Sequence, residues 1–359
     1  MSNKALTLVL KTIVFIIFFS IHFFVLSTIS AIYDIPTTLM TYILPILIIL
    51  FLSFITQKTY SISCQLYAYI YYISTAYLGL ILNMYMFILL YKSLSFFIPF
   101  TRCASVIIAI ISPISVSLYG LINARIITTE EVTIKTALVS SKVTIALLSD
   151  LHLGAVYQGG FTNSIVNIII KEINPDVVLI TGDLFDNNFT PRSEWLKPFS
   201  KIKAPILYVT GNHEEIIGKE EIVKIISTTK MKHLRNTNIS FETIKEVNFI
   251  GVDYGVDINT NTIIANKVDK TKFNILLSHI PQCKPNGLEK YGISLMVCGH
   301  THAGQMIPIH LIDYMISKCF KGLYSFKEYY VFVTQGLGTS LFPMRVASNS
   351  AIGVIKLEN

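Results

Sequence analysis

Long apolar runs without a lysine, arginine, aspartate or glutamate fill most of the first 125 residues, and they constrain the fold more than any other feature. They are Thr12–Tyr33, Thr37–Thr56, Leu66–Tyr91 and Cys103–Asn123. About 20 such residues cross a bilayer as a helix. The sequence therefore predicts an all-α transmembrane region of four helices, with three as the alternative.

The positive charge of the chain is concentrated in this region. Residues 1–125 contain six basic side chains and one acidic side chain, Asp34. The remaining residues are almost balanced, which excludes a nucleic-acid footprint as the reason for the pI of about 9.0. Four spans would place more of the basic residues on the side of the C-terminal region, which predicts a cytoplasmic location for it. On that side lie Lys4, Lys11, Lys58 and Arg125, and on the other lie Lys92 and Arg102.

The cysteines predict neither a zinc knuckle nor a disulfide framework. The chain has five, an odd number, and none are in a C-x-x-C spacing. An unpaired set agrees with a reducing compartment. The cysteines are Cys64, Cys103, Cys283, Cys298 and Cys319.

From about residue 143 the pattern changes to short apolar runs alternating with helical spacing. Runs typical of buried strands are Val143–Leu148, Val177–Ile180, Ile206–Val209, Phe273–Leu277, Ser294–Val297, Tyr329–Thr334 and Ala351–Leu357. Helices are expected at Phe161–Ile173, Arg192–Lys203 and Lys219–Thr228, and antiparallel strands within Asn238–Tyr254. The order favours stacked sheets with helices outside them. Residues 126–142 are interpreted as a linker and first strand, and 143–359 as one domain.

Several of these strands end in residues that bind metal ions. The set consists of Asp150, His152, Asp183, Asn212, His279, His300 and His302. Carboxylate, imidazole and amide donors suit Mn, Fe or Zn, and a carboxylate can bridge two ions. Loops at strand ends can turn such side chains towards one cleft. The sequence therefore predicts a centre for two divalent ions.

The series resembles the calcineurin-like metallophosphoesterase superfamily. It reads Asp150-Leu151-His152, Gly182-Asp183, Gly211-Asn212-His213-Glu214, His279 and Gly299-His300-Thr301-His302, the D-x-H, G-D, G-N-H-[DE], H and G-H-x-H motifs of that family. The following Ala303-Gly304-Gln305 and the stretch Gln335–Ser340 with Pro343 and Arg345 are similar to its membrane-associated bacterial branch. The resemblance implies a four-layer α/β/β/α sandwich.

The resemblance also implies a role for each residue. Asp150, His152, Asp183 and His302 would hold one ion. The other would be held by Asp183, Asn212, His279 and His300, with Asp183 as the bridge. His213 would be the general acid for the leaving oxygen, and Asp186 would orient it. Asp186 can also be read as a solvated turn residue.

Four further residues are interpreted without a catalytic role or are left open. Glu214 is a loop or cap residue. Arg345 either contacts phosphate or forms a surface salt bridge. His233 and His310 match no motif. His22, inside the first span, is interpreted as a packed polar group.

These observations predict a membrane-anchored binuclear phosphoesterase acting on a phosphodiester, a phosphomonoester or a pyrophosphate. A lipid-linked substrate is expected because a single span would suffice for anchoring; the alternative is that the spans only localise the enzyme. The rival function is a degenerate scaffold or sensor that retains the metal site. A transporter is disfavoured because the spans lack the charges that mark ion pathways. No nucleic-acid partner is expected.

Overall fold

The computed structural model describes residues 3–36, 43, 45–46, 48, 65–187, 189–256, 264, 266–283, 288, 291–327 and 329–359, with the side chains from residue 12 onward. The predicted span Thr37–Thr56 lies largely outside the described residues. Within them, three stretches are long and apolar enough to cross a membrane: Thr12–Ile32, Gln65–Ser95 and Arg102–Asn123. They correspond to the first, third and fourth predicted spans.

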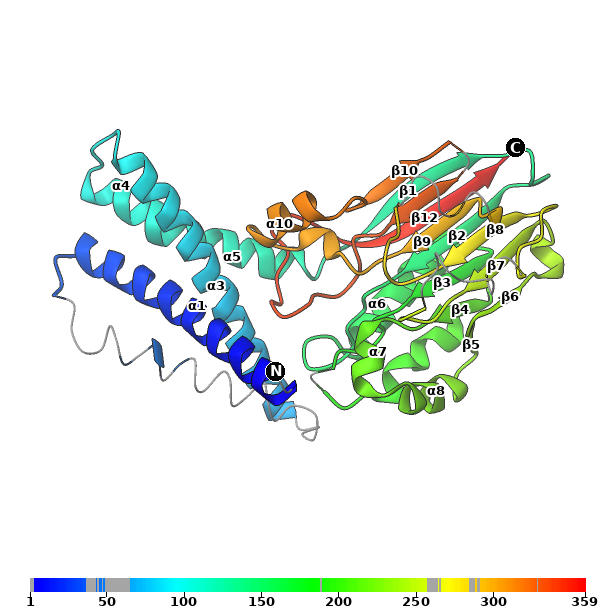
Figure 1. Ribbon diagram of the computed structural model, residues 1–359, viewed down its shortest axis with the longest axis horizontal. Coiled ribbons are helices and arrows are strands. Elements are labelled where there is room, and N and C mark those ends of the chain that lie inside the picture. Colours follow the sequence, from blue (N-terminus) through cyan, green and yellow to red (C-terminus); the bar gives the residue numbers. More distant parts are fainter. Residues whose placement is uncertain are drawn as a thin grey trace.

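The N-terminal helices form an elongated bundle beside the C-terminal domain (Figure 1). They are α1 (Asn3–Ile32), α3 (Gln65–Ser95), α4 (Arg102–Val106) and α5 (Ser112–Asn123), with a π-helical turn Ile107–Ile111 between the last two. The ends of α1 and α3 lie together, because Asp34 pairs with Arg102 at 3.6 Å. α1 and α3 therefore run in the same direction, and α5 returns to the domain.

Two six-stranded mixed sheets make up the domain. The first has the order β1-β12-β2-β3-β4-β5 and the second β10-β11-β9-β8-β7-β6. The strands of the first sheet are β1 (Ile127–Lys135), β2 (Val143–Leu148), β3 (Val177–Thr181), β4 (Ile206–Val209), β5 (Met231–His233) and β12 (Ser350–Glu358). Those of the second are β6 (Thr237–Ile239), β7 (Val247–Gly251), β8 (Phe273–Leu277), β9 (Leu295–Cys298), β10 (Gly322–Ser325) and β11 (Tyr330–Val333).

The sheets pack face to face over an apolar core. Buried side chains such as Leu147, Leu179 and Phe249 lie in this core. The outer face of the first sheet is covered by α6 (Gly159–Ile168) with its π-helical extension Ile169–Ile173, the 3₁₀ helix Ser193–Lys201, α7 (Asn212–Ile217) and α8 (Lys219–Ser227). A third cluster lies on the outer face of the second sheet. The expected class, mixed α/β sheets with helices preceded by apolar helices, is confirmed.

Two local expectations differ from the structure. The helix at Arg192–Lys203 is a 3₁₀ helix, in which Pro198 has no N–H to donate. The expectation of no disulfide is wrong, because Cys283 and Cys319 are bonded. The two cysteines are 36 residues apart in the sequence, so no short spacing motif indicates the pair. Cys103 and Cys298 are free.

The bundle and the domain are in direct contact. Tyr67 and Tyr71 of α3 are part of the domain's apolar core. Further along α3, Gly79 faces Met344, whose Cε would lie 2.6 Å from an added Cβ. A side chain at position 79 would have to displace the flexible end of Met344. The loop that follows Gly336 thus packs its apolar side chains, Phe342 and Met344, against the helices.

Candidate metal centre

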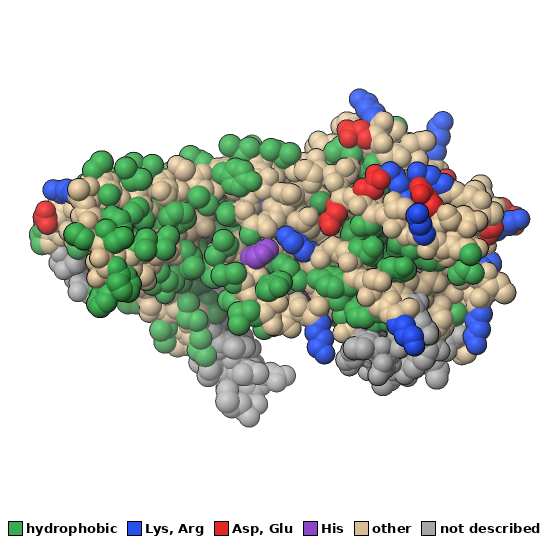
Figure 2. All heavy atoms as spheres, turned by 90° about the horizontal axis from the view of Figure 1, so that it is seen from above, with side chains coloured by type: hydrophobic (Ala, Val, Ile, Leu, Met, Phe, Trp, Pro, Cys, Tyr) green, Lys and Arg blue, Asp and Glu red, His purple; other side chains and the backbone are tan. Residues whose placement is uncertain are grey.

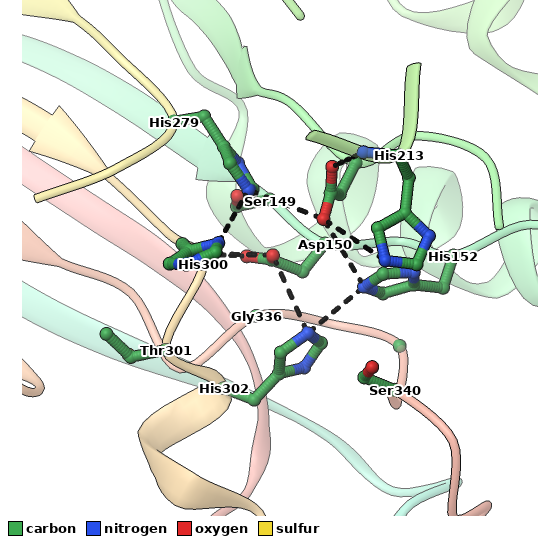
Figure 3. Close-up of polar contacts among 12 residues, drawn as sticks. Ser149, Asp150, His152, His213, His279, His300, Thr301, His302, Gly336 and Ser340 are labelled. Atoms are coloured by element: carbon green, nitrogen blue, oxygen red, sulfur yellow. Dashed lines mark hydrogen bonds and ion pairs between the residues drawn. The ribbon is translucent and has the colours of Figure 1, made fainter. Parts of the chain in front are cut away.

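The topology brings the predicted ligands to one edge of the sandwich. β2, β3 and β4 are parallel neighbours in the first sheet, and β8 and β9 are parallel neighbours in the second. Parallel strands end at the same edge, so the loops after these strands meet. Figure 3 shows the side chains converging from both sheets.

Most of these residues have a backbone conformation that non-glycine residues rarely adopt. The φ angles are 53° for Asp150, 46° for His152, 48° for Asp183, 74° for His300 and 49° for His302. The left-handed region costs an ordinary residue about 1–2 kcal/mol. It turns each side chain sharply off the end of its strand. Such strain at a cluster of polar groups is typical of a functional site.

One group of ligand atoms surrounds His152 and His302. Their Nε2 atoms are 3.0 Å apart. Asp150 Oδ1 lies 3.6 Å from His302 Nε2, and Asp183 Oδ2 lies 3.8 Å from His152 Nε2. All of these side chains are buried. The arrangement leaves their lone pairs facing a common point.

A second group surrounds Asn212. Its Oδ1 lies 2.9 Å from His279 Nε2 and 3.1 Å from His300 Nδ1. Asp183 Oδ2 is 3.3 Å from His279 Nε2. The Nδ1 of His279 donates to the carbonyl of Thr181 at 2.8 Å, which leaves its Nε2 as the ligand atom. Asp183 therefore belongs to both groups, as the bridging role requires.

Close approach of two loops depends on a glycine. A Cβ at Gly211 would lie 2.2 Å from Asp183 Oδ1. Only glycine allows the loop before Asn212 to pass so near that carboxylate. The glycine of the G-N-H motif is therefore required for steric reasons.

The donor set fits divalent cations. The ion-pair partners of Asp150 and Asp183 in the described part of the chain are histidines. Burial opposes ionisation of both Asp183 and His279. Their mutual attraction nevertheless lowers the pKa of Asp183 and raises that of His279 to about 10. Two buried carboxylates thus require positive charge, which metal ions would supply in place of protons.

The spacing of the imidazoles agrees with this assignment. Two nitrogens bound tetrahedrally to one zinc ion at 2.0–2.1 Å would be about 3.4 Å apart. The observed pairs, His152 with His302 and His279 with His300, are 3.0 and 3.1 Å apart. A carboxylate completes each pair. The structure thus brings together all of the predicted ligands in two groups.

His213 lies beside the first group. Its Nε2 is 3.9 Å from Asp183 Oδ2, and its Nδ1 is 3.2 Å from Asp186 Oδ1. Burial alone would lower the pKa of His213. The hydrogen bond to Asp186 and the charge of Asp183 raise it to about 9. Asp186 is buried against the ring instead of lying in a solvated turn, and its contact with Nδ1 favours the protonated form of His213.

Glu214 joins two of the ligand loops. Its buried carboxylate accepts hydrogen bonds from the backbone N–H of Gly211 at 2.6 Å, Asp183 at 2.9 Å and Leu184 at 2.7 Å. A further bond comes from Phe185. The interpretation as a cap was incomplete, because the same carboxylate also fixes the backbone of Asp183.

We expect Glu214→Gln to lower both stability and activity. An amide has one acceptor oxygen, and its NH₂ would face backbone N–H groups that lose their partner. Each unsatisfied buried donor costs about 1–3 kcal/mol. Thermal unfolding of the full chain in detergent should show a lower midpoint. Glu215→Gln, half-exposed and paired with Lys219, is the matched control. Equal midpoints for the two variants would refute this role.

Arg345 fits neither sequence interpretation. Its side chain is fully buried, and its guanidinium donates to the carbonyls of Gly338 at 2.6 Å and His302 at 3.2 Å. Ser348 Oγ accepts a further bond at 2.8 Å. Arg345 thus holds the loop 336–348 against the backbone of a metal-ligand candidate. No local sequence pattern indicates this contact, because it joins loops that are far apart in the chain.

Comparison with known proteins identifies the class. Residues 143–304 match the family model described as calcineurin-like phosphoesterase. An uncharacterized metallophosphoesterase of Helicobacter pylori (strain J99 / ATCC 700824) is 33% identical over 228 residues, 59% of each chain. A transmembrane protein with metallophosphoesterase domain from Danio rerio is 29% identical over 276 residues, 70% of this chain and 62% of that one.

Residues 143–304 are thus assigned to the calcineurin-like phosphoesterase family, as their motifs predicted, and the similar proteins carry metallophosphoesterase names. The chain spans about three fifths of the length of these two relatives. A third relative, an uncharacterized metallophosphoesterase of Aquifex aeolicus, is 26% identical over 259 residues, which cover 67% of this chain and 95% of that protein.

Proposed function

We propose that the chain is a membrane-anchored, binuclear metal-dependent phosphoesterase. Residues 1–125 would form the membrane region, 126–142 the connection with its first strand, and 143–359 the catalytic domain. The observation that carries the proposal is the convergence of two ligand groups on Asp183, with His213 beside them.

Two divalent ions, Mn, Fe or Zn, would activate a water molecule for attack on phosphorus and neutralise charge on the phosphoryl oxygens. The first group described above would hold one ion and the second group the other. Asn212 contributes a neutral oxygen, which leaves the total ligand charge low enough for a phosphate anion to approach. His300 is the exposed member of the set and marks the open side.

The acid–base work falls to His213. Its Nε2 points towards Asp183, at the edge of the ligand set, while Nδ1 is held by Asp186. A protonated Nε2 can donate to the leaving oxygen as the P–O bond breaks. Asp186 acts as a positioning residue that fixes the ring and favours its charged form.

A direct assay tests the proposal. The purified full chain with added Mn²⁺ should hydrolyse at least one of three substrates: a generic phosphodiester, a phosphomonoester or a nucleotide-linked lipid pyrophosphate. A chelator should abolish the activity and Mn²⁺ should restore it. Turnover that persists in metal-free protein, or no turnover of any of the three, would contradict the proposal. The second outcome would favour the scaffold or sensor function.

We further propose that the substrate carries its phosphorus group at the membrane surface. Arg125 follows the last helix and lies over the rings of Tyr72 and Tyr157 at 5.5 and 5.0 Å. Tyr157 belongs to the loop that follows the first ligands, Asp150 and His152. The catalytic edge therefore lies next to the helix ends, where a lipid headgroup would be.

The orientation of the domain is a separate prediction. The parallel course of α1 and α3 puts the basic N-terminal residues on the side of the domain, and Asp34 offsets Arg102 at the opposite end. We propose on this basis that the domain lies in the cytoplasm, because basic residues near span ends favour that side. The disulfide Cys283–Cys319 removes the cysteine argument for that side, since disulfides persist in oxidising compartments.

A reporter fused after Asn359 that works only in the cytoplasm should therefore be active. The expected result rests on the bias of basic residues alone. An otherwise identical fusion to a reporter that works only outside the cytoplasm is the control. Activity of the control fusion instead would place the domain, with its disulfide, on the oxidising side.

A further inference from the structure

Helix α10 (Ile309–Ile316) has its apolar face turned outwards. Met315 is 83% exposed, Ile316 72% and Tyr314 68%, and Leu311 and Ile312 are also exposed. The more buried side carries His310, whose ring nitrogen bonds to the carbonyl of Ala303, and Asp313. A helix on a water-facing surface has the opposite arrangement. The exposed face of α10 carries no charged side chain.

The position of α10 relative to the membrane helices indicates what covers its exposed face. Arg125 stacks over Tyr72 at the start of the bundle, and such residues favour the headgroup level. Ile309, at the start of α10, packs in a cluster with Leu78 and Leu82 of α3. Leu78 lies six residues beyond Tyr72 on α3, about 9 Å further along the helix at 1.5 Å per residue. That distance agrees with the depth of roughly 5–10 Å at which interfacial helices lie.

The surface is continuous with that of the bundle. Ile309, at the start of α10, shares an apolar cluster with Leu121, near the end of α5, and Figure 1 draws the two helices close together. Hydrophobic side chains extend from the bundle to the middle of the molecule, whereas charged side chains gather on the far part of the domain (Figure 2). Leu341, in the loop held by Arg345, is exposed as well. The catalytic domain therefore contributes apolar surface at the level of the spans.

A groove leads from the end of α10 to the metal centre. It has a volume of about 520 Å³ and is lined by Ile316, Lys318, the Cys283–Cys319 disulfide, Thr301 and His300, among others. Its lining combines the apolar side chain of Ile316, the positive charge of Lys318 and His300, which is a member of the second ligand group. An apolar side chain, a cation and a metal-ligand candidate in one groove match an amphiphile with a phosphate headgroup.

We propose that α10 lies in the bilayer surface and forms the wall along which a lipid phosphoester reaches His300. The occupant of its exposed face is the lipid bilayer. This proposal rests on the phosphoesterase function for its substrate, but the location of α10 does not. The disulfide fixes the end of the helix to the loop that follows His279, so the groove keeps its shape at the membrane.

Spin labels test the location. The full chain with Cys64→Ser and Cys103→Ser is labelled at Met315→Cys or Ile312→Cys in nanodiscs. Both sites should be more accessible to O₂ than to a water-soluble nickel chelate. A label at Ile170→Cys, an exposed apolar position on the helical face of the domain, is the control and should show the reverse. Chelate accessibility equal to that control would overturn the proposal. So would strong coupling between labels of two chains, which indicates a dimer interface.

Charge substitutions test the path. Ile312→Asp with Met315→Asp should lower kcat/KM for a phosphoester embedded in vesicles by about tenfold, since charges oppose insertion of α10. Turnover of soluble bis(4-nitrophenyl) phosphate should stay within about twofold, because both side chains are exposed and neither lines the groove. Ile170→Asp should change neither.

The outcomes separate the two proposals. Equal effects on both substrates would overturn the groove as a lipid path. If the unmodified chain cleaves no phosphoester while the labels report lipid contact, the phosphoesterase function fails and the membrane location of α10 stands.

Discussion

Replacement of Asp183 by Asn should remove most of the bound metal and nearly all activity. Asp183 belongs to both ligand groups, and its Oδ2 approaches His152 and His279. An amide is neutral and bridges two cations poorly. We expect kcat/KM to fall by at least about 1,000-fold, or about 4 kcal/mol of transition-state stabilisation. Elemental analysis should show fewer than two ions per chain.

The control for this change is Glu172→Gln, an exposed carboxylate at the end of the helix that follows α6. It removes the same charge far from the centre and should leave metal content unchanged. Metal content and activity of Asp183→Asn equal to those of this control would show that Asp183 does not bridge. The hydrogen bond from the N–H of His213 to Asp183 Oδ1 can also be made by an amide oxygen, so the fold should persist.

Replacement of His213 by Ala should slow the enzyme according to the leaving group. A leaving oxygen of high pKa needs a proton as it departs, and general acid catalysis contributes about 10²–10⁴-fold. Alkyl phosphoesters should therefore lose about that factor, whereas a 4-nitrophenyl ester should lose much less. The measurement is kcat/KM across a series of leaving groups for both proteins.

In the His213→Ala variant, kcat/KM should fall more steeply with increasing leaving-group pKa than in the unmodified protein. That steeper dependence is the signature of lost proton donation. Asp186→Asn should show the same trend with a smaller amplitude, because the ring is still present but less well held and less basic. Metal content should remain near two ions per chain in both variants. A uniform loss across all leaving groups would assign His213 to binding or structure instead of proton transfer.

Much of the fold was readable from the sequence because its signals are local. The strands β2, β4 and β8 occupy the predicted residues. A short apolar run bounded by glycine, proline or polar residues is too short for a buried helix and is typical of a buried strand. A first strand was expected within residues 126–142, but without its bounds or its partner. It is β1, which carries Glu130 and Glu131 and pairs with β12 at the opposite end of the domain sequence. The sequence of β1 does not record that partner.

The candidate ligands were also readable, because strand ends in parallel order must meet and the residue types restrict the chemistry. The sequence determined which side chains are available, that Asp183 can bridge, and that the first part of the chain is apolar enough to enter a membrane. Only the tertiary structure decided which distant groups touch. Glu214 fixes two loops, Arg345 is buried behind His302, Cys283 reaches Cys319, and α10 turns its apolar face outwards. These contacts join residues far apart in the chain, and neither periodicity nor spacing records them.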